Sequence, residues 1–199
     1  MSKLKELTQH LKRGDVYRRA DLAQWSNAVD RHLRELVNDG TLRKLSQGLY
    51  YYPKETAFGE APPDEETLVR SFLKDDEFLL TSPNAYNSLG VGTTQLYNKR
   101  VVYNHKRHGE FELGGRKFSF QMKPRFPKKL TPEFLLVDLV NNVEELAEDT
   151  VEVLSKVQTK ARTMDTKKLK QSVTAYGGVR AKKFFAPVLT PNKEQHYAR

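Results

Sequence analysis

Leucines recur at helical spacing at the start of the chain. Leu4, Leu7 and Leu11 are three and four residues apart, which places them on one face of a helix. We expect this helix to end by Gly14. A short extended piece and a second, shorter helix over residues 20–25 are predicted next, so two helices precede residue 26.

A third helix with a clearer pattern is predicted over residues 27–39, with Ser26 as its N-cap and Gly40 as its stop. At about 100° per residue, one face is apolar and carries Val29, Leu33, Leu36 and Val37. The opposite face is polar and carries side chains suited to phosphates and base edges, namely Asn27, Arg31, Arg34 and Asn38. We interpret His32 as a packing residue.

The stretch TLRKLSQGLYYYP, residues 41–53, predicts a β-hairpin that turns at Gly48. Three helices followed by a hairpin is the order of a winged helix-turn-helix, whose third helix enters the major groove of DNA. The hairpin would be the wing and would contact DNA through Arg43, Lys44, Ser46 and Gln47. Arg18 and Arg19, at the start of the second helix, would contact phosphate.

The middle of the chain alternates helix and strand signals. After the connector around Pro62, we expect a helix capped by Asp64, a strand over residues 78–81, and a short helix from Ser82 to Gly90. Gly114 and Gly115 divide two further strands. The whole is predicted to be α+β, with a winged helix-turn-helix domain at residues 1–54 and a mixed α/β domain at residues 55–199, which is strand-rich over 76–123 and helical over 131–190. Residues 190–199 are expected to form a loose tail.

Charge is distributed unevenly over the 199 residues. The net charge is +9, hydrophobic residues make up 38% and charged residues 30%, and cysteine is absent, which excludes disulfides and thiolate metal sites. Residues 1–54 carry about +5, residues 55–150 about −4 and residues 151–199 about +8. Basic ends attract polyanions. The apolar runs are too short to span a bilayer and the start lacks a signal peptide, so a cytoplasmic protein without membrane contact is expected.

Signals for catalysis are weak. His105 and His108 form an H-x-x-H pair near Glu110, but on a strand they would point to opposite faces. Gln121 and Lys123, with the Asp75-Asp76 pair, resemble only loosely the sites of metal-dependent nucleases. We therefore expect no catalytic residue, no metal and no cofactor. Two alternatives stay open: a nuclease-like domain tethered to a DNA reader, and a protein-interaction module that does not bind DNA.

Residues 17–53, which lie within the head (residues 1–54), resemble the winged-helix head of the AbiEi-type antitoxins of bacterial type IV toxin-antitoxin systems. The pattern of that family is an Asp-Leu pair, then a helix with R-x-L-x-x-L, then G-x-L-x-x-L-x-x-G-x-Y. In this chain it corresponds to Asp21-Leu22, residues 31–36 (RHLREL), and Gly40-Thr41-Leu42 followed by Leu45 and Gly48-Leu49-Tyr50. Residues 80–120 are similar to the antitoxin domain that follows, and residues 165–178 (DTKKLKQSVTAYGG) fit its helical tail.

This resemblance implies two activities. The head would bind inverted repeats in the promoter of its own operon and repress transcription. The second domain would neutralise a nucleotidyltransferase-like toxin of the AbiEii class. Type IV antitoxins are described as acting without a stable complex, so the resemblance leaves direct toxin contact open.

Overall fold

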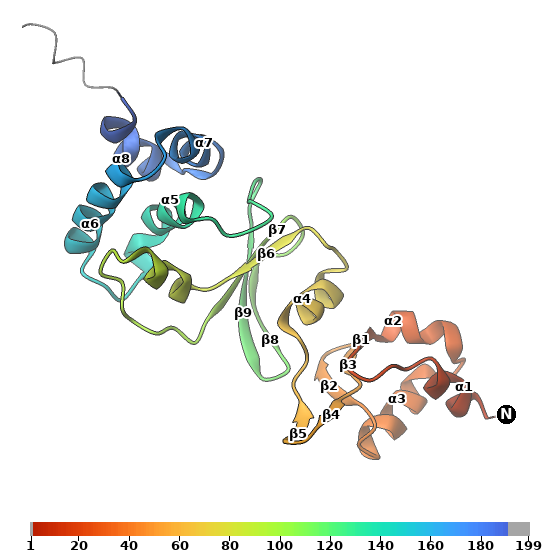
Figure 1. Cartoon of the computed structure of the whole chain (residues 1–199). Coiled ribbons are helices and arrows are strands. Elements are labelled where there is room, and N and C mark those ends of the chain that lie inside the picture. The colour runs from red at the N-terminus through yellow and green to blue at the C-terminus, as the bar shows by residue number, and fades with distance from the viewer. Residues whose placement is uncertain (1, 191–199) are drawn as a thin grey trace, which may run out of the picture. The chain divides into compact units, whose positions relative to one another are not determined.

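A computed structural model describes residues 2–190 and shows a mixed α+β fold (Figure 1). Packing divides the chain into two units. Unit 1 contains Met1–Phe78 and Lys106–Phe120, and unit 2 contains Leu79–His105 and Gln121–Arg199. The α+β class is confirmed. The domain boundary predicted after residue 54 stays a prediction.

Unit 1 begins with short helices and a small antiparallel sheet of strand order β1-β3-β2. These elements are α1 (Lys3–Gln9), β1 (Val16–Arg18), α2 (Arg19–Leu22), the 3₁₀ helix η1 (Ala23–Trp25), α3 (Val29–Asn38), β2 (Arg43–Ser46) and β3 (Leu49–Tyr51). Their order matches the one expected from the pattern. A leucine-rich core joins them, consisting of Leu7, Leu11, Leu22, Val29, Leu33, Leu36 and Leu42.

The start of α3 differs from the expectation. The residue that precedes its first turn is Ala28, so the prediction of Ser26 as N-cap is wrong. Ser26 is buried, and its Oγ accepts a hydrogen bond from the Ala28 N–H at 3.1 Å. The Ser26 hydroxyl also bonds Nδ1 of the buried His32, six residues further along the chain, at 2.7 Å. The end of the helix agrees with the prediction, because Gly40 has a φ of 80°.

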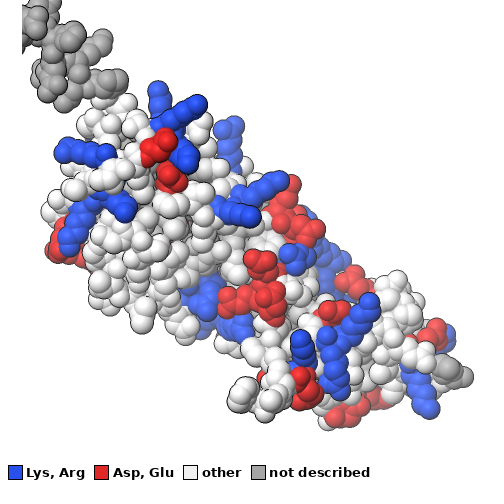
Figure 2. Space-filling view, viewed as in Figure 1, with Lys and Arg blue, Asp and Glu red and all other residues white. Residues whose placement is uncertain are grey.

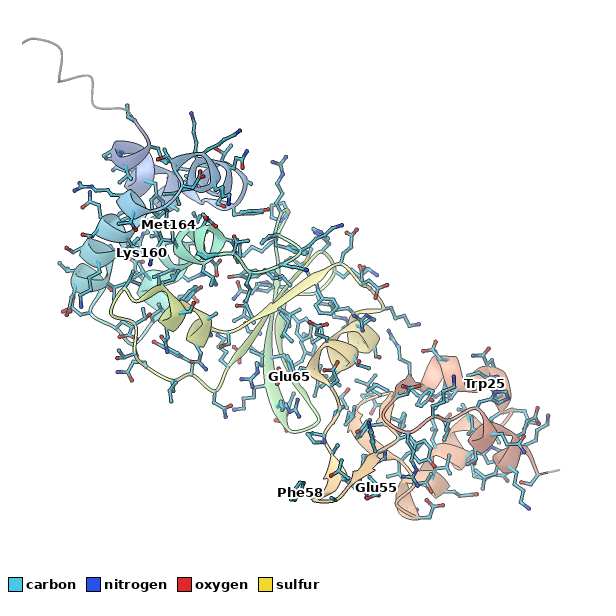
Figure 3. All side chains as sticks on the ribbon, viewed as in Figure 1. Trp25, Glu55, Phe58, Glu65, Lys160 and Met164 are labelled. Carbon is cyan, nitrogen blue, oxygen red and sulfur yellow. The ribbon has the colours of Figure 1, made fainter. Side chains whose placement is uncertain are left out.

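The rest of unit 1 consists of two hairpins and one helix. The first hairpin pairs β4 (Lys54–Thr56) with β5 (Gly59–Ala61), and the helix α4 (Glu65–Leu73) follows it. The second hairpin pairs β8 (Gly109–Leu113) with β9 (Arg116–Met122). The last two residues of β9 belong to unit 2. Phe58 lies fully exposed at the tip of the first hairpin (Figure 3). Asp64 caps α4 by accepting from the Thr67 N–H at 2.9 Å, as predicted.

Unit 2 begins with strands and a 3₁₀ helix and continues as a helical bundle. Its elements are β6 (Phe78–Thr81), whose first residue belongs to unit 1, η2 (Pro83–Leu89), β7 (Arg100–Asn104), α5 (Pro132–Asn142), η3 (Val143–Glu145), α6 (Thr150–Thr163), α7 (Thr166–Tyr176) and α8 (Val179–Leu189). Helix α5 is buried along most of its length and packs against α6, α7 and α8 (Figure 1). Ser82 caps η2, at the start of the short helix that was expected there, and Asp165 caps α7. Of the predicted tail, only Thr190 lies within the described residues.

The buried carboxyl group of Asp138, on α5, links several elements of unit 2 by hydrogen bonds. The Tyr86 hydroxyl donates to one oxygen of Asp138 at 2.6 Å, and the Tyr103 hydroxyl donates to the other at 2.8 Å. Asn142 donates to both tyrosine hydroxyls at 3.2 Å. Burial raises the pKa of Asp138 and of both tyrosines above their ordinary values. This network joins η2 and β7 to α5.

We expect Asp138→Ala to lower the free energy of unfolding by about 3 kcal/mol, because two buried hydroxyl groups lose their acceptor. Asp138→Asn keeps one oxygen acceptor and should cost less. Urea denaturation followed by circular dichroism measures both variants. Equal stability of Asp138→Ala and the unaltered protein would contradict the structural role of the network.

Candidate nucleic-acid interface

Helix α3 separates an apolar face from a polar one, as the pattern predicted. Val29, Leu33 and Leu36 are buried in the head core. The side chains expected to face DNA are exposed, namely Asn27, Arg31, Arg34 and Asn38. Arg31 lies 3.9 Å from the Glu35 carboxylate one turn away. Such an exposed pair is weak and exchanges easily for another anion, so the polar face is available to a ligand.

His32 connects the two faces of α3. Its side chain is only 3% exposed, and its Nδ1 bonds Ser26. The interpretation of His32 as a packing residue is therefore confirmed. Arg31 lies beside the other ring nitrogen, with 3.4 Å between Nη2 and Nε2. The Ser26–His32 pair thus fixes the start of the helix that carries Arg31 and that Asn27 precedes.

Arg19 lies next to this face but is engaged within the head. Its guanidinium donates two hydrogen bonds of 2.6 Å to the Asp30 carboxylate. The hydrogen bond from Arg19 holds the pKa of Asp30 below its ordinary value. The pair joins α2 to α3. A phosphate contact by Arg19 would therefore have to be shared with, or exchanged for, the Asp30 contact.

The β2–β3 turn is formed as predicted, and Gly48 adopts a φ of 72° that favours glycine. Lys44 and Gln47 are exposed, whereas Ser46 is partly buried. Arg43 lies at the first residue of β2, away from the turn, and its guanidinium pairs with Glu60 and donates to the Gly40 carbonyl. Of the two basic residues on this strand, Lys44 is thus better placed for a backbone phosphate.

Both signs of charge appear on the surface of the head (Figure 2). Three ion pairs of opposite sign lie within unit 1 at the predicted residues, namely Arg19–Asp30, Arg31–Glu35 and Arg43–Glu60. Arg18 donates from Nη1 to the Ser71 carbonyl, on α4, at 3.4 Å. The sequence-predicted residues therefore share one unit, but several of them already have protein partners.

The residues considered for catalysis belong to both units. His105 and His108 lie in the segment between β7 and β8, so their assumed placement on a strand is wrong. Asp75 pairs with Lys106 at 3.1 Å, and Asp76 pairs with Arg70 at 2.6 Å. Within residues 2–190, no group of three His, Cys, Asp or Glu side chains is arranged to hold a metal ion. In the same range, no helix is long and apolar enough to cross a membrane.

The structural roles of two residues, Asp138 and Arg107, were not predicted from the sequence. Asp138 lies within an apolar helical pattern and gave no sign of its buried tyrosine partners. Arg107 lies in unit 1, where it lines a pocket with the β2–β3 turn. The only signal for Arg107 was the basic run of residues 105–108, His-Lys-Arg-His, which was considered for metal binding alone.

Comparison with known proteins assigns most of the chain to a family. A family model described as a family of unknown function, DUF6088, matches residues 3–172. The chain belongs to this family. A search of curated proteins gives no match. The crystal structure of the RV2827C protein from Mycobacterium tuberculosis is similar, with a TM-score of 0.57 and 18% identity over 94% of this chain and 74% of that one. At this identity, the likeness shows a shared fold.

We expect Ser26→Ala to lower the free energy of unfolding by about 1–2 kcal/mol, because the buried His32 loses its hydrogen-bond partner. Urea denaturation measures the loss. Ser155→Ala, on the exposed face of α6, is the matched control and should be neutral. If both serine variants were equally stable, the Ser26–His32 contact would have no anchoring role.

Proposed function

We propose that this chain is a DNA-binding transcriptional autorepressor and the antitoxin of a type IV toxin-antitoxin system. In this proposal the head is a winged helix-turn-helix, with α3 as the recognition helix and the β2–β3 hairpin as the wing. The protein acts in the cytoplasm and has no catalytic role.

The observation that carries the proposal is the exposed polar face of α3. A helix of ten residues presents two arginines and ends with Asn38, Asn27 precedes its first turn, and its other face is fixed in the head core. Arginine binds guanine edges and phosphates bidentately, and asparagine binds adenine edges. A basic hairpin follows the helix directly, which is the arrangement of a winged helix.

The antitoxin role is supported by the sequence resemblance to AbiEi-type antitoxins over the head, residues 80–120 and residues 165–178. In the proposal, the domain at residues 55–199 counteracts a nucleotidyltransferase-like toxin. Its basic helices α6, α7 and α8 suit an acidic surface, whether of a protein or of a nucleic acid. Co-expression of the chain with the toxin encoded beside it, followed by growth measurement, tests this part of the proposal.

The double variant Arg31→Ala and Arg34→Ala tests the recognition helix. We expect binding to duplex DNA from directly upstream of the gene to weaken by at least about thirtyfold, since two specific base contacts of about 1–3 kcal/mol each are lost. The fold should persist because both side chains are exposed. Fluorescence anisotropy measures affinity and circular dichroism measures folding. Unchanged affinity in a folded variant would exclude α3 as the reader.

Lys44→Ala tests the wing. A phosphate contact carries no sequence information, so the variant should weaken binding similarly on all duplexes. The slope of log affinity against log salt concentration should become shallower by about one. Titrations at three or more salt concentrations give this slope. A loss confined to one DNA sequence would instead indicate that Lys44 contacts a base.

A further inference from the structure

A pocket of about 270 Å³ opens beside the β2–β3 turn. The turn contributes Ser46, Gln47 and Gly48, and Arg18 lines the pocket from the end of β1. A second arginine, Arg107, enters from the segment that precedes β8, about 60 positions further along the chain. All lining residues belong to unit 1. Two guanidinium groups therefore share one pocket with the turn of the proposed wing.

Backbone and aromatic contacts hold the two sides of this pocket together. The Gly114 N–H, at the end of β8, donates to the Leu45 carbonyl on β2 at 3.0 Å. The guanidinium of Arg107 lies 4.7 Å from the ring centroid of Phe72 and 5.9 Å from that of Phe111. Phe72 and Phe111 pack against each other with centroids 5.1 Å apart. The β8 segment is thus fixed beside the hairpin.

The chemistry of the pocket suits an anion with several oxygen atoms. Stacking on an aromatic ring engages the face of a guanidinium, whereas phosphate oxygens are bound by its N–H edge, so the two contacts are compatible. Arg18 is positioned by its hydrogen bond to the Ser71 carbonyl. Glu112 is the one acidic residue among the lining residues, so the two arginines leave the lining with a net positive charge.

We propose that this pocket binds a phosphate group of the DNA backbone, with Arg107 as an anchor outside the head. The inference rests on the proposed function and extends it, because it makes residues 106–113 part of the DNA-binding surface. The phosphate would lie beside the turn, with Arg18 and Arg107 as its charged ligands and Gln47 at its side. A free nucleotide offers the same phosphate chemistry, so the experiment must separate these two sources.

The test is a titration of the full chain on the upstream duplex. We expect Arg107→Ala to weaken binding about tenfold on all sequences and to reduce the salt slope by about one. Arg107→Lys keeps the charge and should recover part of the affinity. Lys54→Ala removes the same charge from an exposed strand of unit 1 that does not line the pocket, and should bind like the unaltered protein.

Methylphosphonate substitution in the duplex locates the contact. Neutralising one phosphate at a time should reveal a position where the unaltered protein loses affinity and Arg107→Ala does not. A folding defect would not produce this position-specific pattern. Identical profiles for the two proteins would overturn the inference.

A calorimetric titration of the full chain with a nucleoside monophosphate tests whether the pocket binds a free nucleotide instead of DNA. Nucleotide binding that depends on Arg107, with duplex affinity independent of it, would overturn the assignment to DNA. Duplex binding that is lost in the Arg31/Arg34 variant but unchanged in Arg107→Ala would overturn the inference alone. Absence of duplex binding by the unaltered protein would overturn the proposed function and the inference together.

Discussion

The burial of one face of α3 determines which side chains the head presents to a ligand. Val29, Leu33 and Leu36 pack into the leucine-rich core, and each fully buried side chain of this kind contributes about 1.5–3 kcal/mol. Rotating the helix would expose these side chains to water. Arg31 and Arg34, on the opposite face of the helix, therefore stay exposed to solvent. The Ser26–His32 bond fixes the helix start in the same orientation. A DNA-reading role for the head depends on this constraint.

Local sequence patterns were sufficient for most elements of the fold. Helix α3, the β2–β3 hairpin and the capped helix α4 follow from leucine spacing, a glycine turn and Asp64, which act within a few residues. The N-cap of α3 could not be predicted in the same way. Ser26 has the right side chain, but its hydroxyl bonds the ring of His32, six residues further along the chain, and the helix begins only at Val29.

Only those features of the candidate site that depend on neighbouring residues in the sequence could be predicted. The exposure of Arg31 and Arg34 follows from helical periodicity. Arg19 pairs with Asp30 on α3, and Arg43 pairs with Glu60 on β5. The sequence does not reveal how these elements are placed relative to one another, so neither partner could be predicted. Arg107 was missed for the same reason. Its place beside the β2–β3 turn depends on the Gly114–Leu45 bond between distant strands.

The central claim is that the head reads a specific DNA sequence. Its most direct test is a titration of the protein on the duplex upstream of its own gene and on a scrambled duplex of equal length, at two salt concentrations. Base contacts predict a preference for the native duplex that persists at the higher salt concentration, because only the phosphate contribution is screened. Equal affinity for both duplexes, declining together with salt, would contradict the account.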